Sequence, residues 1–434
     1  YIMSADGKKL LIQGPNQVLL TADIAEEIKP ETLNTSDIKA FIEPRAEWQQ
    51  IFDEVWRMEK QFFYAENMHG LDWKSIREKY EPLLSYVTTR EDLNLLLVEM
   101  IAELQVGHNR IGGGDVHRED SVAIGLLGAD LRVENNRYRV AKIYTGEQWN
   151  PFLKAPLSPP GIGVSEGDYI LSINGVELDG NTNIYSLLAQ TVGKQVALEV
   201  NDATGFENSR EIIVEPIENE TALRRWNWIE ENRLYVEEKT DGRVGYIYLP
   251  DTAADGFTYF NRMFFAQVDK EAMIIDERRN GGGQAANYIT DILGRNYLAS
   301  WRDRDGLTFD TPGGAIYGPK VMLVDQDAGS GGDFLPYAFK RQQLGTLIGT
   351  RTWGGLIGIS ANPSLIDGGS LVVPYFRFYT PDGDWRIENE GVMPDIEVAL
   401  EPDAYNRGID SQLERSIEEI MAQLEGYESI RKTQ

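Results

Sequence analysis

The 434-residue chain contains no cysteine, which excludes disulfide bridges, thiolate metal sites and a cysteine nucleophile together. Histidine is scarce as well. Only His69, His108 and His117 are present, so a reaction that needs an imidazole base must use one of these three. No stretch approaches ~18 consecutive apolar residues, so no membrane-spanning segment is expected. We expect neither a metal ion nor a cofactor.

Basic residues are fewer than acidic ones, with 42 Lys and Arg against 69 Asp and Glu, which gives a formal net charge of −27. A field of this sign repels nucleic acid and anionic lipid, and neither is expected as a partner. Simple solubility explains the same charge. The first nine residues carry no apolar core of a signal peptide, although a removed leader remains an alternative.

The hydrophobic pattern divides the chain into four segments. Residues 1–38 begin with a hairpin that turns at Asp6-Gly7, the remnant of a larger β-structure such as a propeller blade. Residues 39–120 have helical spacing, and 121–218 alternate short apolar runs with turns. In 219–434, strands alternate with helices. The predicted fold is α/β (α+β multidomain), ending in an α/β domain with a mixed sheet and crossover helices.

The segment of short strands resembles a PDZ domain in the permuted strand order of processing peptidases. The run Gly167-Asp168-Tyr169-Ile170-Leu171-Ser172-Ile173-Asn174-Gly175 carries this resemblance. It implies a β-barrel or sandwich in which residues 125–128 bind a terminal carboxylate, as PDZ grooves bind an extended peptide by strand addition. The alternative is a module that only spaces the neighbouring domains.

Ser330 lies in the run Ala328-Gly329-Ser330-Gly331-Gly332-Asp333-Phe334, between a buried strand at 321–324 and an amphipathic helix. A serine at such a turn projects its hydroxyl from a helix N-terminus, and the N–H group of Gly331 then faces developing negative charge. A plain helix-capping serine fits the same pattern.

A second glycine run, Gly281-Gly282-Gly283, also follows a buried strand and begins a helix. Exposed N–H groups in such a run bind an oxyanion, and they complete an oxyanion hole with Gly331. The run lacks the lysine and hydroxyl residue of a P-loop, which argues against nucleotide binding. A tight structural turn is the alternative.

Among the histidines, His108 is the candidate base, because it follows an apolar helix that ends at Val106-Gly107 and is held in a defined orientation. His69 lies in a turn and reads as structural, whereas His117 lies in a charged, surface-like run. Glu388 alternates with Ile387 and is a candidate inward carboxylate, which needs a hydrogen-bonded partner.

Taken together, these segments resemble the C-terminal half of the tricorn protease family, which is related to the C-terminal processing peptidases. That half consists of a helical first catalytic domain, a PDZ domain and an α/β second catalytic domain, after two β-propellers. The resemblance spans nearly the whole chain. The segments that carry it are Asn67-Met68-His69-Gly70-Leu71-Asp72-Trp73, Glu103-Leu104-Gln105-Val106-Gly107-His108, Gly245-Tyr246-Ile247-Tyr248-Leu249-Pro250, Ile348-Gly349-Thr350-Arg351-Thr352-Trp353-Gly354-Gly355 and Glu388-Asn389-Glu390-Gly391.

The resemblance implies a serine peptidase that cleaves peptides by acyl transfer. Ser330 would be the nucleophile, His108 the base and Glu388 a member of the relay. The oxyanion hole would use Gly331 and Gly283. Gly281, Gly282 and Asp303 would contact the substrate, and Asp303 would bind a basic substrate side chain. The alternative is that the run 301–305 is a self-paired surface segment.

Two positions depart from the related patterns. The family usually has a hydroxyl residue before the histidine, where this chain has Gly107. Processing peptidases activate their serine with a lysine, where this chain has Gly355. The second departure favours His108 as the base. The first keeps open a catalytically lapsed peptide-binding scaffold, and an envelope C-terminal processing peptidase is the other alternative.

The resemblance also implies peptide substrates, a homohexameric assembly and a cytoplasmic location. A periplasmic location is the alternative if a leader precedes this sequence. The sequence itself carries no sign of symmetry.

Overall fold

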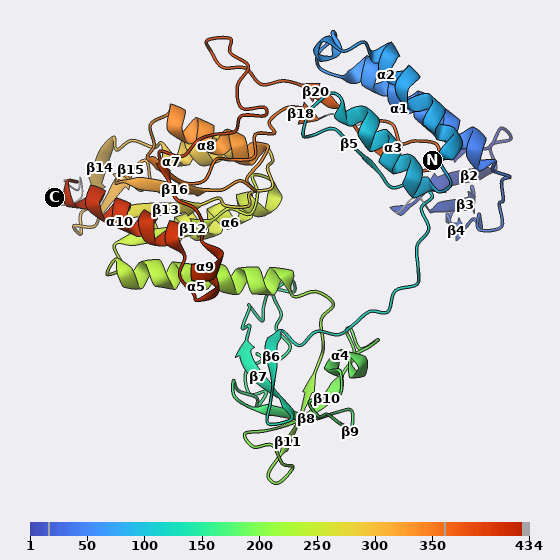
Figure 1. The fold of residues 1–434 in the computed structure, drawn as a ribbon. Helices are drawn as coiled ribbons and strands as arrows, with labels where there is room; N and C mark the ends of the chain where they lie inside the picture. The colour runs from blue at the N-terminus through green and yellow to red at the C-terminus, as the bar shows by residue number, and fades with distance from the viewer. Residues whose placement is uncertain (16–17, 360–361, 428–434) are drawn as a thin grey trace.

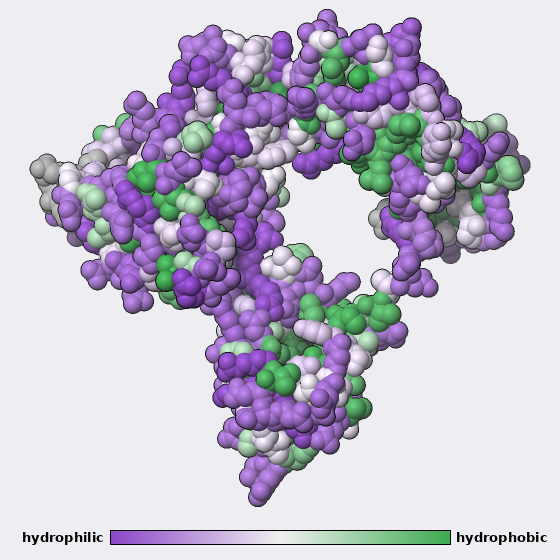
Figure 2. All heavy atoms as spheres, viewed as in Figure 1, coloured by the Kyte–Doolittle hydropathy of each residue, from purple (hydrophilic) through white to green (hydrophobic). Residues whose placement is uncertain are grey.

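The computed structural model describes residues 1–15, 18–359 and 362–427. The chain forms a helical body, a small β-rich body and an α/β body, joined by extended segments (Figure 1). In the space-filling view the three bodies surround an opening (Figure 2). The predicted α/β multidomain fold is confirmed.

The N-terminal residues form a small antiparallel sheet in the order β1-β2-β3-β4. Its first hairpin turns at the expected position, because Gly7 N–H donates to the Ser4 carbonyl and Gly7 has a positive φ of 69°. Most of the sheet is exposed, so its role as the remnant of a propeller stays a prediction. The strands are β1 Ile2–Met3, β2 Lys9–Gln13, β3 Leu19–Asp23 and β4 Glu31–Thr32.

The helical body owes its helix starts to local sequence. Pro44 begins the first helix, the Asp72 carboxylate caps the second, and Thr89 forms a capping box with Asp92 at the start of the third. Their apolar faces enclose one core. The elements are α1 Pro44–Phe62, η2 Met68–Gly70, α2 Trp73–Tyr80, η3 Glu81–Tyr86 and α3 Arg90–Ala102.

The β-rich body is an open antiparallel sheet in the order β11-β10-β8-β7-β6, with β9 paired to β8. Two-residue turns with positive φ at both positions, Asn135-Asn136 and Asn174-Gly175, set its tight hairpins. The helix of this body, α4, is only one turn long. The elements are β6 Ala129–Glu134, β7 Arg137–Ile143, β8 Tyr169–Ile173, β9 Val176–Glu177, α4 Ile184–Leu187, β10 Val196–Asn201 and β11 Arg210–Val214.

The α/β body contains a five-stranded sheet in the order β12-β13-β16-β17-β21. Its described strand pairs are all parallel, and the antiparallel pairs of this half lie in separate ribbons rather than in one mixed sheet. Helices cover both faces of the sheet (Figure 1). The elements are α5 Thr221–Lys239, β12 Val244–Tyr248, α6 Ala254–Phe265, β13 Ala272–Asp276, α7 Ala286–Leu293, β16 Lys320–Val324, α8 Gly331–Arg341, β17 Thr346–Gly349, β21 Ile396–Glu397, α9 Pro402–Asn406 and α10 Ser411–Glu425.

One excursion of the α/β half reaches the helical body, and it determines where the site forms. Ile357, Leu365, Leu371 and Val373 are buried in the core of the helical body rather than in their own. In the same excursion β19 pairs with β5, a strand that begins two residues after His108. The remaining strands are β5 Arg110–Gly112, β14 Ala299–Arg302, β15 Thr308–Thr311, β18 Gly358–Ile359, β19 Ser370–Val372 and β20 Pro374–Phe376.

Among the residues that the structure describes, none of the helices combines the length and the hydrophobicity needed to span a membrane.

Candidate active site

Ser330 lies at a sharp turn between β16 and α8. Its φ of 58° and ψ of −116° are unusual for a residue with a side chain, and such strained geometry concentrates at functional sites. A Cβ at Gly329 would lie 2.5 Å from the Trp353 ring, and one at Gly331 would lie 2.1 Å from Thr252 Oγ1. Both flanking positions therefore require glycine, and the turn is fixed by its surroundings.

A buried carboxylate holds this turn in place. Asp333 Oδ2 accepts from the Ser330 N–H at 2.8 Å and from the Gly355 N–H at 3.0 Å. Its Oδ1 accepts from Thr352 Oγ1 at 2.5 Å and from the Gly354 N–H at 2.8 Å. Burial raises the pKa of Asp333, while the four hydrogen bonds act in the opposite direction. Asp333 thus ties the serine to the loop 352–355.

The glycine run after β13 lies directly against this turn. A Cβ at Gly282 would lie 2.6 Å from Ser330 Cβ, and Gly283 has a φ of 140°. Gly281 N–H donates to the Pro250 carbonyl and Gly282 N–H to Asn280 Oδ1. The N–H groups of Gly283 and Gly331 have no acceptor within the described part of the chain. Among the described residues, Gly283 and Gly331 thus have unpaired N–H groups beside Ser330, and their role as oxyanion donors stays a prediction.

His108 faces the same space from the helical body. The side chain is 9% exposed, and its Nδ1 has no hydrogen-bond partner among the described residues. Burial lowers the pKa of His108, and Arg110 lowers it further, whereas Asp333 acts in the opposite direction. The neutral imidazole, which is the form a general base requires, is therefore favoured.

Trp353 packs beside His108, with ring centroids 5.3 Å apart and planes inclined at 59°. Gly107, Gly329 and Gly355 surround the indole, and a Cβ at any of the three would lie within 2.6 Å of a ring atom. The indole therefore fills the space in which the family's hydroxyl residue would stand. The sequence pattern shows the departure at Gly107, but not that the Trp353 indole leaves room only for glycine there.

Glu388 contacts the backbone beside His108 and not the imidazole. Its Oε2 accepts from the N–H groups of Leu356 and Ile357 at 2.7 and 2.9 Å, and its Oε1 accepts from the Gly107 N–H at 3.4 Å. Ile387 is buried at 3% exposure and Glu388 is half-buried with hydrogen-bonded partners, although both lie in a turn rather than in a strand. The carboxylate connects the histidine segment to the start of the excursion at 356.

A second buried carboxylate, that of Glu59, holds the residue that follows His108. With its NH₂ group facing acceptors, the Asn109 amide donates to Glu59 Oε1 at 2.8 Å and to the Val372 carbonyl at 3.2 Å. Glu59 is fully buried on α1, and burial raises its pKa to about 8. The residue after the histidine is thus held between the helical body and β19.

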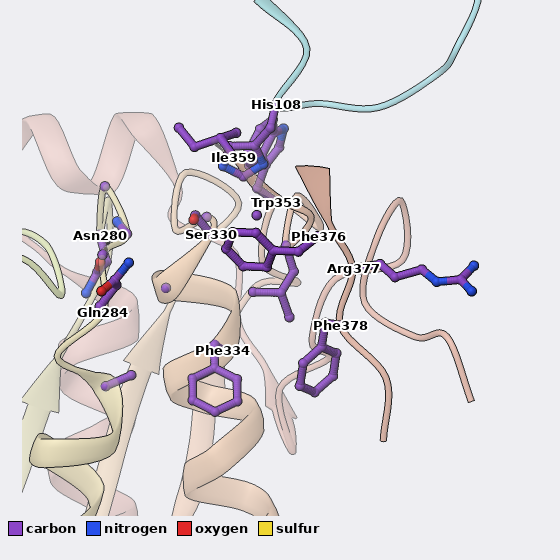
Figure 3. Close-up of a pocket in the computed structure, with 18 of the residues that line it drawn as sticks. His108, Asn280, Gln284, Ser330, Phe334, Trp353, Ile359, Phe376, Arg377 and Phe378 are labelled. Atoms are coloured by element: carbon purple, nitrogen blue, oxygen red, sulfur yellow. Dashed lines mark hydrogen bonds between the residues drawn. The ribbon is translucent and has the colours of Figure 1, made fainter. Parts of the chain in front are cut away.

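Ser330, His108, Trp353 and the two glycine runs line one cleft of about 1190 Å³. His108 and Ser330 face the same space, with Trp353 beside the imidazole, while the guanidinium of Arg377 points away from them (Figure 3). In the same view Asn280 and Gln284 lie on one side of Ser330, and Phe376 and Phe378 lie on the other (Figure 3). The apolar lining includes Phe334, Leu356, Ile359, Phe376 and Phe378, and the polar lining includes Asn280, Gln284, Asn287, Gln326 and Asp327.

The other sequence candidates lie elsewhere. Asp303 lies in the turn after β14, where its carboxylate accepts from the N–H groups of Asp305 and Leu307, and it is not among the cleft-lining residues of this chain. Its role as a substrate contact stays a prediction. His69 bonds Tyr64 and the Leu104 carbonyl, as a structural residue does, and His117 is exposed.

The loop 125–128, expected to bind a carboxylate, has its N–H groups largely engaged. Gly125 donates to the Leu188 carbonyl and Leu126 to the Ile217 carbonyl. Gly128 donates at 2.7 Å to a carboxylate of the chain itself, that of Glu220. These bonds favour the module's spacing role over capture of a peptide by this loop.

Comparisons with known proteins match three successive parts of the chain. The chain matches the tricorn protease C1 domain over residues 44–102, the tricorn protease PDZ domain over 125–219 and peptidase family S41 over 243–398. The fold and the matches define a member of the S41 class. More particularly, the chain belongs to the tricorn protease family.

The tricorn protease homolog 1 of Streptomyces coelicolor is 33% identical over 98% of this chain and 40% of its own length. The homolog of Saccharolobus solfataricus is 35% identical over 98% and 40%. The crystal structure of the tricorn protease aligns with a TM-score of 0.92 at 30% identity, over 98% of this chain and 41% of that one. The chain thus spans about two fifths of the length of these relatives.

Sequence reasoning missed Asp333 as a positioning group. The signal was present, because a serine followed three residues later by an acidic side chain is the pattern of a capping box. What the pattern does not show is that the carboxylate also reaches across to Thr352, Gly354 and Gly355.

Proposed function

We propose that this protein is a serine peptidase of the tricorn type that hydrolyses peptides through Ser330 and His108. One observation carries the proposal: a strained serine turn, an available pair of N–H groups and a neutral-favoured histidine line a single cleft. His108 and Ser330 lie more than two hundred residues apart in the sequence, and capping of α8 by Ser330 does not explain why both residues line the same cleft.

In the proposed reaction, the neutral His108 takes the proton of the Ser330 hydroxyl while Oγ attacks the peptide carbonyl. The resulting oxyanion accepts hydrogen bonds from the N–H groups of Gly283 and Gly331, each worth roughly 3 kcal/mol of transition-state stabilisation. The protonated imidazole then gives its proton to the leaving amine. Water releases the acyl group by the same steps, with His108 again as base.

Glu388 acts in this proposal as a positioning residue. Its hydrogen bonds to Gly107, Leu356 and Ile357 support assigning it the alignment of the histidine segment with the cleft. The carboxylate of Asp333, whose charge acts against the lowered pKa of His108, favours the imidazolium that forms during attack. Direct transfer of a proton from His108 to Glu388 is not part of the mechanism.

The substrates are peptides bound in an extended form along the cleft. Gly281 and Gly282, which have no side chains, let the substrate backbone approach the oxyanion loop. Asp303 stays our candidate for a basic substrate side chain. It would serve in this role if another copy of the chain presents it to the cleft.

Cleavage of fluorogenic peptides tests the proposal. Peptides with Arg or Leu before the scissile bond are compared on the wild type, on Ser330→Ala and on Ser85→Ala, which changes an exposed serine that does not line the cleft. We expect Ser330→Ala to abolish cleavage and Ser85→Ala to leave it unchanged. Cleavage by Ser330→Ala at the wild-type rate would overturn the assignment. Loss of Arg preference in Asp303→Asn would support the substrate role of Asp303.

We also propose a homohexameric assembly and a cytoplasmic location, on the resemblance to the family alone. Light scattering on the purified chain measures the first, and fractionation of cells that express the full gene product measures the second. A monomer at the concentrations used for activity would refute the assembly. A membrane or periplasmic fraction would refute the location.

A further inference from the structure

A second cavity of about 450 Å³ lies on the far side of the two catalytic loops, at the carboxyl end of the parallel sheet. Residues 278–279 and 325 line this cavity, whereas 280–283 and 326–327 line the catalytic cleft. The loops after β13 and β16 therefore form the wall between the two. The carboxyl edge of a parallel sheet is a common place for ligands in α/β proteins.

The cavity is basic in a chain of net charge −27. Four arginines line it: Arg224, Arg225, Arg278 and Arg279. Two are neutralised. Arg224 pairs with Asp130 and Glu220, and Arg278 pairs with Asp276 and Asp410, as the ion-pair distances of 2.6 to 2.8 Å show.

The other two guanidinium groups are available. Within the described residues, neither Arg225 nor Arg279 makes a side-chain hydrogen bond, an ion pair or a cation–π contact. Both lie close enough to Tyr248 to act against the upward pKa shift that burial gives its phenol. The one carboxylate that lines the cavity, Asp325, accepts at Oδ1 from the N–H groups of Arg279, Asp327 and Ala328.

The floor of the cavity is aromatic. Trp228 and Tyr248 meet edge to face with ring centroids 5.0 Å apart, and Tyr405 and Leu400 add apolar surface. A planar guanidinium matches the geometry of a carboxylate or a phosphate, and aromatic walls hold an apolar group beside it. The volume suits a ligand of the size of one or two residues.

We propose that this cavity binds a small oxoanion, a carboxylate or a phosphate on a molecule with an apolar group, through Arg225 and Arg279. The backbone of Arg279 leads directly into Gly281-Gly283, and its N–H is bonded to Asp325, at the start of the loop that leads to Ser330. An anion held there fixes both loops and links occupancy of the cavity to the geometry of the catalytic cleft.

Isothermal titration at constant ionic strength tests the site with inorganic phosphate, N-acetylphenylalanine and the uncharged N-acetylphenylalaninamide. The comparison uses wild type, Arg225→Gln and the control Arg304→Gln, which removes the same charge from an exposed turn. We expect at least one anion to bind wild type and Arg304→Gln equally, and Arg225→Gln at least tenfold more weakly. Phosphate or carboxylate binding alone identifies the source of the oxoanion, and either supports the site.

The proposal would be overturned by equal binding to Arg225→Gln and wild type, or by binding of the amide as tight as that of the acid. Absence of binding by both anions would overturn it as well. If Arg225→Gln does not fold, Thr221→Glu replaces it. This exposed residue lines the cavity at the N-terminus of α5, where a glutamate favours the helix and competes with the anion. Because the readout is binding, it does not depend on the proposed peptidase activity.

Discussion

The indole of Trp353 fills the space that a side chain at Gly107 would need, because a Cβ at position 107 would lie 2.6 Å from Cζ2 of the indole. The position where the family usually carries a hydroxyl residue is therefore closed here by a side chain from the other half of the site. We interpret this as an exchange, in which packing against Trp353 orients His108 in place of a hydrogen-bonded hydroxyl.

Gly107→Ser is accordingly expected to impair this protein. The hydroxymethyl group forces the indole aside, at a cost of about 1 to 3 kcal/mol for overpacking, and kcat for peptide hydrolysis falls about tenfold or more. The smaller ring of Trp353→Phe makes room, so the double variant recovers part of the loss. A Gly107→Ser variant more active than wild type would show that the hydroxyl relay, and not the indole, is what His108 lacks.

Asp333→Asn tests the clamp on the serine turn. An amide presents one oxygen and one NH₂ group to four donors, so at least one buried N–H or hydroxyl loses its acceptor. We expect a loss of about 3 kcal/mol in unfolding free energy and a fall in kcat larger than any change in KM. Denaturant unfolding and steady-state kinetics measure both, with the exposed Asp291→Asn as control. Unchanged kcat would contradict the clamp.

The pH dependence of activity follows from His108. Because burial and Arg110 lower the pKa of its imidazole, the base stays neutral to a lower pH than an exposed histidine, and the acid limb of kcat/KM lies at lower pH than an ordinary histidine would set it. Removing the cation in Arg110→Gln raises this pKa and moves the acid limb to higher pH. Arg118→Gln, an exposed position outside the cleft lining, serves as control. An acid limb of kcat/KM that does not move, or that moves to lower pH, would contradict the assignment of His108 as the base.

Glu59 predicts a pH-dependent stability. Its pKa is about 8 in the folded protein against an ordinary value of 4.5, so its contribution is complete below pH 4.5 and is lost as the pH rises towards 8. Glu59→Gln does not titrate and keeps an acceptor for Asn109. The variant should equal wild type near pH 4 and exceed it by roughly 3 kcal/mol at pH 7. Thermal unfolding across this range, with the exposed Glu66→Gln as control, measures the difference. A constant difference would contradict the burial argument.

The local sequence predicted the parts of the site but not their assembly. Glycines around Ser330, a strand before it and a helix after it are all visible in one short run, because turn chemistry is local. Parallel strand pairs followed from the alternation of strands with crossover helices. What brings His108 to Ser330 is the excursion that carries Leu371 into the helical core, and this pairing of β19 with β5 is a long-range contact with no local pattern.

The same reason explains the two further positioning groups. Asp333 accepts hydrogen bonds from a loop about twenty residues away, and Trp353 fills the space beside Gly107. Neither contact can be read from residue spacing or composition. The relay expected from the resemblance placed Glu388 near His108, and the structure gives it backbone partners on both sides of the site.

The most direct measurement is covalent labelling with a serine-directed phosphonate, followed by mass-spectrometric mapping of the modified residue. The wild type should be labelled at Ser330 alone, and His108→Gln should react at least a hundredfold more slowly while keeping its fold. Labelling at another serine, or equal rates in wild type and His108→Gln, would contradict the claim that this imidazole activates this hydroxyl.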